Sequence, residues 1–187
     1  MKTWWLGLGA LLLSGCAASG EAGQPQPGAP AGEALPDYGP APELAGSTWL
    51  NRAGPLRLAD LRGKVVLIDF WTFGCVNCQN VIPSLKDWHA RYGPEGLVVI
   101  GDHYPEFAYE ADLQNLTAAI GRLGVPYLVV QDNDGATWDA YRVRFWPTLF
   151  LIDKRGRVRY THIGEGQYAE TEAAIRALLA EAYPQGD

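Results

Sequence analysis

The sequence predicts an α/β domain in which helices flank a central mixed β-sheet. From about residue 47 onward, short apolar runs alternate with stretches of helical periodicity, which is typical of this fold class. The run Val65–Phe70 is almost continuously apolar, as expected for a strand that is buried on both faces. The turn sequence Asp153–Gly156 lies between two further apolar runs and predicts a hairpin near the C-terminus.

The elements are expected in a definite order. A hairpin at the start is predicted from the turn-forming segment Asn51–Pro55 between two apolar pairs. The helix that follows Cys75 has apolar residues at helical spacing, should be kinked by Pro83 and ends at Gly93. The full expectation is hairpin 49–58, strand 65–70, helix 75–92, strand 97–100, loop 101–110, helix 111–123, strand 127–130, short helix 137–141, strands 148–152 and 158–162, and helix 168–182.

The N-terminus has the pattern of an export signal. Lys2 provides a short positive region, and the apolar run Trp4–Leu13 is too short to span a bilayer as a stable helix. The run leads into Cys16 through two small residues and resembles the lipobox of bacterial lipoproteins. In that family the signal is cut before the cysteine, which then carries lipid. The resemblance predicts a signal peptide over residues 1–15 and lipidation of Cys16. An ordinary secretory signal with a coincidental cysteine is the alternative.

The segment after Cys16 is predicted to be a tether. Residues 17–42 hold six of the thirteen prolines and almost no large apolar side chain. Such a composition cannot bury enough surface to offset the entropy lost on ordering. We therefore expect residues 16–42 to form a lipidated, semi-extended tether and residues 43–187 to form one domain.

Charge and cysteine usage narrow the classes of function. The formal net charge is −6 without a basic cluster, which argues against nucleic-acid binding. Export implies an oxidising or mixed redox compartment, and lipid on Cys16 would leave Cys75 and Cys78 as the remaining thiols. Two cysteines three residues apart close too small a loop to stabilise a fold, so a purely structural disulfide is not expected.

These two cysteines carry the most specific chemical signal. Cys75 falls at the first turn of a predicted helix, where unpaired N–H groups and the helix dipole stabilise a thiolate. A thiolate beside a second thiol is the reactive unit of disulfide exchange: Cys75 would attack a substrate disulfide, and Cys78 would resolve the mixed disulfide. Asp69 ends an apolar strand nearby. Burial would raise its pKa and allow it to accept the proton of Cys78, whereas a carboxylate satisfied by backbone N–H groups is the alternative.

The order of elements and five stretches of sequence resemble the thioredoxin-like redoxins of the TlpA and DipZ type. The stretches spread over most of residues 47–182 and are Leu61–Leu67, Trp71–Cys78, His103–Phe107, Trp146-Pro147 and Gly164–Gly166. The resemblance implies a thioredoxin fold with an N-terminal β-hairpin and a βα insertion. It also implies a bacterial, lipid-anchored thiol–disulfide oxidoreductase that uses neither a cofactor nor a bound metal.

The resemblance extends to residues around the cysteines. Asp69 matches a thioredoxin aspartate that accepts the resolving proton, and Trp71 is expected to pack beside the site and bind substrate. The Trp146–Pro147 bond is expected to be cis and to face the cysteines, so that the Trp146 backbone can pair with an extended substrate, with core packing of Trp146 as the alternative. Glu106 lies in a loop beyond a strand end, where sites on such sheets form. It is expected to shape the substrate groove unless it is simply solvated.

The predicted protein is a monomer that faces the periplasm from the bacterial cell membrane or the outer membrane. Its expected partners are protein thiols and disulfides, with a membrane thiol-electron transporter as reductant. The family suggests reduction or isomerisation of exported protein disulfides, although oxidation uses the same residues. The natural substrate, the redox partner and the direction of electron flow stay open at this point.

Three other functions would use some of these residues. A closed zinc site needs two more ligands, and the histidines at 89, 103 and 162 have no second paired spacing. A thiophilic metal (copper) chaperone would exploit the affinity of thiolates for Cu(I), but the usual thioredoxin-like copper carriers have three residues between their cysteines. A peroxidase of the peroxiredoxin kind would need a proline where Ile68 stands, four residues before Thr72.

Overall fold

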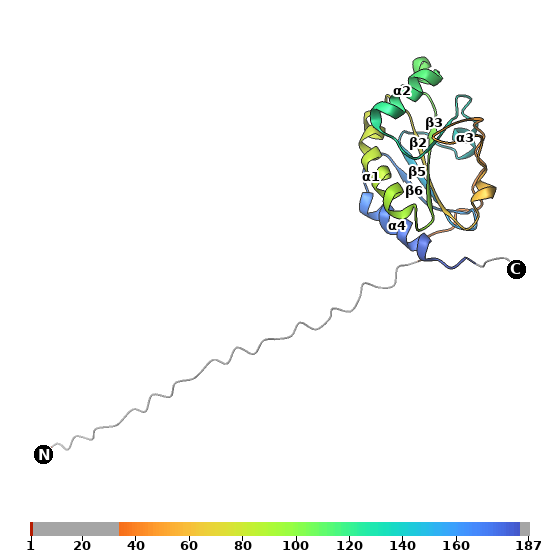
Figure 1. Ribbon diagram of the computed structural model, residues 1–187. Coiled ribbons are helices and arrows are strands. Elements are labelled where there is room, and N and C mark those ends of the chain that lie inside the picture. Colours follow the sequence, from red (N-terminus) through yellow and green to blue (C-terminus); the bar gives the residue numbers. More distant parts are fainter. Residues whose placement is uncertain (2–33, 184–187) are drawn as a thin grey trace. The chain divides into compact units, whose positions relative to one another are not determined.

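The computed structural model describes Met1 and residues 34–183 (Figure 1). The rest of the predicted signal peptide, the predicted lipidation site Cys16 and residues 17–33 lie outside the described residues. Within the part that is described, no helix combines the length and the apolar character needed to cross a bilayer.

The core of the domain is a six-stranded mixed sheet in the order β1-β4-β3-β2-β5-β6. β2 lies at its centre, parallel to β3 and antiparallel to β5, and all seven residues of β2 are buried. This confirms the prediction of a central strand buried on both faces. The strands are β1 (Thr48–Leu50), β2 (Val65–Trp71), β3 (Leu97–His103), β4 (Leu128–Gln131), β5 (Thr148–Ile152) and β6 (Val158–Ile163).

Helices cover both faces of this sheet. Figure 1 shows α1, α2 and α4 on one side and the short α3 on the other. Their bounds are α1 (Val76–Tyr92), α2 (Leu113–Leu123), α3 (Ala136–Ala140) and α4 (Tyr168–Ala180). β4 runs parallel to β3 and is followed by α3. The two faces bury separate hydrophobic clusters, one under α1 and α4 and one under α3.

Local sequence explains where the helices begin and end. Asp112 caps α2 by accepting a hydrogen bond from the Asn115 N–H at 2.9 Å, and Gly124 ends it in the left-handed conformation (φ 60°). Cys75 is the N-cap of α1, and Pro83 lies inside that helix. Both thiols therefore lie at the start of a helix.

The predicted N-terminal hairpin is wrong. β1 pairs with β4 at the edge of the sheet, and residues 58–61 form a 3₁₀ turn rather than a strand. The side-chain amide of Asn51 donates to the carbonyls of Val125 and Tyr127 at 2.9 and 2.7 Å, which ties the supposed turn to the segment before β4. The Glu43 carboxylate accepts the N–H of Leu58, which a second strand would have needed. Long-range pairing thus overrides the local turn signal.

Two predicted boundaries also move. Residues before 43 are part of the folded domain, because Leu35 and Tyr38 hydrogen-bond to β6: the Tyr38 N–H donates to the Val158 carbonyl at 2.9 Å, and Arg159 donates to the Leu35 carbonyl at 2.9 Å. β3 continues through residues 101–103, where the sequence predicts a loop. Polar residues are unusual inside a buried strand. Because of Asp102 and His103, the end of β3 has the sequence pattern of a loop.

Candidate active site

Cys75 and Cys78 are free thiols in different surroundings at the start of α1. Cys75 is partly exposed, whereas Cys78 has no exposed surface. The backbone N–H of Cys78 donates to the Cys75 sulfur at 3.2 Å, so the sulfur itself acts as the N-cap acceptor of the helix. The Cys75 thiol is thus accessible to a substrate, whereas the Cys78 thiol is buried.

The turn between β2 and α1 is held by backbone and side-chain hydrogen bonds. The Cys75 N–H donates to the Thr72 carbonyl at 3.3 Å, and the Gln79 amide donates to the Phe73 carbonyl at 2.8 Å. The carboxylate of Glu110, which has no exposed surface, accepts the Gly74 N–H at 2.9 Å. The residue before Cys75 is therefore fixed from a distant part of the chain.

Asp69 lies in the core on the same side of the sheet as Cys78. It has no exposed surface, and neither carboxylate oxygen has a hydrogen-bond partner among the described residues. Burial raises the pKa of Asp69 to about 8. Burial and then the charge of Asp69 also raise the pKa of the Cys78 thiol. Because two neighbouring buried groups resist being charged together, ionisation of Cys78 favours a protonated Asp69.

Trp71 has a different position from the one expected. Its side chain has no exposed surface, and its ring meets His103 edge-on with 5.4 Å between the centroids. A side chain that is fully covered cannot line a surface for substrate, so Trp71 packs beneath the site. Packing of Trp71 beside the cysteines stays a prediction, and direct binding of substrate by its side chain does not fit this structure.

The Trp146–Pro147 peptide bond is cis, as the resemblance implied. Thr148 pairs with Phe70, so Pro147 lies level with the end of β2, where the turn to Cys75 begins. Pro147 is buried, and the partly exposed Trp146 ring packs on Trp138 with 4.6 Å between centroids. Among the described residues no backbone hydrogen bond involves Trp146. The Trp146 side chain thus packs against Trp138, while the Trp146 backbone remains available for hydrogen bonding.

The predicted role of Glu106 is not supported by contacts. Its side chain is exposed and makes no hydrogen bond or ion pair within residues 34–183, and only its backbone N–H is engaged, by the buried carboxylate of Glu110. Sequence reasoning missed Glu110 because it stands at the end of a segment that reads as loop. It also missed His103, whose pKa burial lowers to about 4 and whose Nε2 lies 3.4 Å from the Thr72 hydroxyl.

No group of three or more cysteine, histidine or acidic side chains suited to holding a metal ion occurs in the part of the chain that the structure covers. The described part of the site offers an accessible thiol, a buried thiol and a buried carboxyl whose pKa burial raises to about 8.

Comparison with known proteins agrees with this geometry. The chain is 48% identical to the protein DipZ of Mycobacterium tuberculosis over 153 residues, which cover 80% of this chain but only 22% of DipZ. It is 28% identical to the thiol–disulfide oxidoreductase YkuV of Bacillus subtilis, over 76% of this chain and 95% of YkuV. The chain thus spans about a fifth of DipZ and almost all of YkuV.

Solved structures give the same result. A crystal structure described as a thioredoxin-like superfamily protein has a TM-score of 0.73 and 33% identity, over 78% of this chain and 99% of that one. The pneumococcal exposed lipoprotein thioredoxin of Streptococcus pneumoniae has a TM-score of 0.61 and 26% identity, over 73% of this chain and 98% of that one.

The fold and the dithiol define a thioredoxin-like thiol–disulfide oxidoreductase, which confirms the fold and the enzyme class predicted from sequence. The family model described as the AhpC/TSA family matches residues 39–161, and the chain belongs to this family.

Proposed function

We propose that this protein is an extracytoplasmic, membrane-tethered oxidoreductase that reduces or isomerises disulfides of exported proteins through Cys75 and Cys78. The observation that carries the proposal is the unequal burial of the two thiols, with a buried, unpartnered carboxyl on the side of Cys78. A dithiol of this kind separates an attacking sulfur from a resolving one.

The proposed reaction takes two steps. The Cys75 thiolate attacks one sulfur of the substrate disulfide; a mixed disulfide forms, and the other substrate sulfur leaves as a thiolate. Cys78 then loses its proton to Asp69 and attacks the Cys75 sulfur, which breaks the mixed disulfide. The substrate leaves reduced by two electrons and takes up two protons, while the enzyme is left with a Cys75–Cys78 disulfide. In isomerisation, the released substrate thiolate instead attacks a second disulfide of the same substrate, and the thiolate freed there attacks the substrate sulfur of the mixed disulfide. Cys75 then leaves as a thiolate, and the enzyme ends in its reduced form.

Exposed apolar side chains support a polypeptide substrate. Val76, directly after the attacking cysteine, is 69% exposed, and Phe145, directly before Trp146, is 62% exposed. Phe107 and Tyr109 stack on each other. Tyr109 also packs against Phe73 in the turn between β2 and α1 (residues 72–75), called the active-site turn below. An extended substrate strand could rest on these side chains and pair with the free backbone of Trp146.

The membrane tether is proposed from Cys16. Its lipobox-like context is the main support, and a second support is the likeness of the domain to the pneumococcal thioredoxin, which is described as an exposed lipoprotein. A fatty-acid label should enter the wild-type protein but not Cys16→Ala, and Cys16→Ala should move from the membrane fraction to the soluble fraction. Equal labelling of both forms would reject the anchor.

The direction of electron flow is proposed to be reductive, with a membrane thiol transporter as electron donor. The equilibrium of the Cys75–Cys78 pair with glutathione or dithiothreitol tests this. A potential near the thioredoxin value of about −270 mV supports a reductase, and one near about −120 mV, as in a strong disulfide oxidant, contradicts it.

A further inference from the structure

Glu110 is a buried carboxylate with three hydrogen bonds, all to backbone N–H groups. One oxygen accepts the Gly74 N–H at 2.9 Å. The other accepts the N–H groups of Glu106 and Phe107 at 2.7 and 2.9 Å. The side chain has no exposed surface and forms no ion pair within the described residues. A buried charge that is satisfied only by aligned donors holds those donors in a narrow geometry.

The contact between Glu110 and Gly74 explains why a glycine precedes Cys75. Gly74 does not have a positive φ, so its backbone would accept alanine. A Cβ at this position would, however, collide with Oε1 of Glu110 and lie 2.8 Å from the Tyr109 hydroxyl. The close approach of the carboxylate, and not a special backbone conformation, requires the missing side chain.

We infer that Glu110 is a positioning residue for the attacking cysteine: its carboxylate locks the 104–111 loop to the active-site turn and so sets the place of the Cys75 sulfur at the N-terminus of α1. The inference rests on the proposed function only in taking Cys75 as the nucleophile. Glu110 reaches Cys75 through the Gly74 backbone and makes no contact with substrate in this account.

The Glu110 carboxylate binds two segments of the chain, and each contact has its own consequence. At one end, the Phe73–Gly74 peptide directly before Cys75 is fixed, which keeps the Cys75 sulfur where the Cys78 N–H can donate to it. At the other end, the carboxylate holds the backbone of Phe107, which stacks on Tyr109 beside Phe73. Loss of the carboxylate should therefore loosen the nucleophile and the aromatic surface beside it together.

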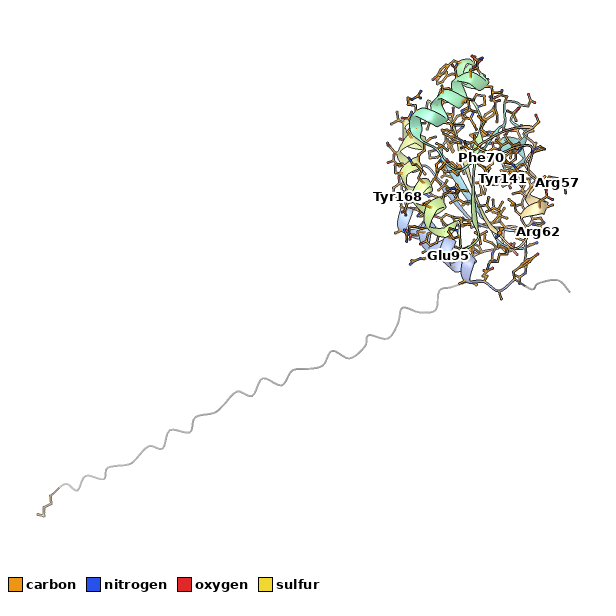
Figure 2. All side chains as sticks on the ribbon, in the orientation of Figure 1. Arg57, Arg62, Phe70, Glu95, Tyr141 and Tyr168 are labelled. Carbon is orange, nitrogen blue, oxygen red and sulfur yellow. The ribbon has the colours of Figure 1, made fainter. Side chains whose placement is uncertain are left out.

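The first test compares Glu110→Gln with a matched control, Glu95→Gln. Glu95 is exposed and lies between α1 and β3, at the end of the sheet away from the cysteines (Figure 2). The readout is the rate of Cys75 alkylation by iodoacetamide at 25 °C, located by mass spectrometry, with circular dichroism as the check of folding. We expect Glu110→Gln to react about tenfold more slowly, the factor for one lost charge-assisted hydrogen bond, and Glu95→Gln to stay within about twofold of wild type. A purely structural role would lower the melting temperature and leave the rate of the folded protein unchanged, which would overturn the inference.

A double-mutant cycle keeps the inference testable if Glu110→Gln folds poorly. Gly74→Ala should slow alkylation because its new methyl group displaces the carboxylate. In a Glu110→Ala background that also carries Tyr109→Phe, the same change should cost little, because both oxygens that the new methyl group would meet are gone. Equal effects of Gly74→Ala on the alkylation rate in both backgrounds would overturn the inference that Glu110 positions Cys75. Alkylation of Cys75 does not require the protein to reduce a disulfide. The proposed function is tested separately, by measuring whether the wild type reduces a protein disulfide. Failure of the inference can therefore be distinguished from failure of the proposed function.

Discussion

Each face of the central sheet buries one carboxyl that forms no ion pair among the described residues, and the two faces use it differently. Asp69 in β2 pairs with Gly101, and Asp102 in β3 pairs with Phe70, so the two side chains point to opposite faces. Both have no exposed surface. Asp69 has no hydrogen-bond partner among the described residues, whereas the Thr137 side chain beside Asp102 lowers the pKa of Asp102 against the larger effect of burial.

The neighbours of the two carboxyls differ. Asp69 lies on the face covered by α1, where its charge is felt by the buried thiol of Cys78. Asp102 lies on the face of Phe70 and Tyr141, whose rings are 5.2 Å apart (Figure 2). Burial, and then the charge of Asp132, raises the pKa of Asp102.

The comparison shows that burial alone gives a carboxyl a raised pKa but no reaction to catalyse. Asp69 becomes useful because the group beside it must lose a proton during turnover. Asp102 faces an aromatic cluster and a second acid that is already occupied, since Asp132 accepts the N–H groups of Ala136 and Trp138 at 2.9 Å each. The two residues therefore form a natural pair for experiments.

The largest expected effect is on the pH dependence of stability. A carboxyl that is protonated in the folded state and ionised in the unfolded state lowers stability as the pH rises, by about 1.4 kcal/mol per pH unit. For Asp69 this loss extends from the unfolded pKa near 4 up to about pH 8. His103, with a pKa lowered to about 4, has the opposite effect up to about pH 6.5, where its unfolded form becomes neutral.

The interval from pH 6.5 to 8 therefore separates the effect of Asp69 from that of His103. Urea unfolding of the wild type should give a free energy of unfolding that falls across this interval. Asp69→Asn should flatten the slope, and a wild-type slope of zero would contradict the account of Asp69.

The next effect separates the two faces by activity. Asp69→Asn removes the proton acceptor of Cys78 and should slow resolution of the mixed disulfide about 100-fold, a typical value for a lost general base. Asp102→Asn, the matched change on the other face, should leave that rate within about twofold. The measurement is the single-turnover release of reduced substrate at pH 7. Equal slowing by both variants would mean that the effect comes from the disturbed core and not from proton transfer.

A smaller effect should come from the glycine that shares the face of Asp69. A Cβ at Gly101 would lie 2.7 Å from Nε1 of Trp71, so Gly101→Ala overpacks the core beside Asp69. We expect a loss of about 1–3 kcal/mol in the free energy of unfolding. Unchanged stability would show that the Trp71 side of the core is not tightly packed.

The smallest effect is expected at Gly121 in α2, which serves as the control for Gly101. A Cβ there would meet nothing within 4 Å. Because glycine weakens a helix interior, Gly121→Ala should raise the free energy of unfolding by about 0.5–1 kcal/mol. Chemical denaturation of both variants in parallel gives the comparison, and destabilisation by Gly121→Ala would contradict it.

Sequence reasoning is most successful where local pattern and chemistry coincide. The apolar run of β2, the Cys-x-x-Cys pair at a helix start and the carboxyl of Asp69 inside the apolar run all lie within fourteen residues. Each is visible without knowledge of distant contacts. The order of the later strands and helices is also predicted correctly, because each has its own apolar run and turn residues.

The failures come from contacts between distant parts of the chain. β1 pairs with β4 instead of its sequence neighbour, and Glu110 reaches Gly74 across 36 residues. Nothing in a local pattern reveals such partners. The polar end of β3 reads as a loop because Asp102 and His103 are buried against expectation, and only the assembled sheet explains how they are covered.

The most direct test of the account is the division of labour between the two cysteines. Purified Cys78→Ser and Cys75→Ser should each be reduced, mixed with a protein disulfide and analysed by mass spectrometry under non-reducing conditions. The account predicts a stable mixed disulfide through Cys75 in the first variant and none in the second. Equal capture by both variants, or capture by Cys75→Ser alone, would contradict it.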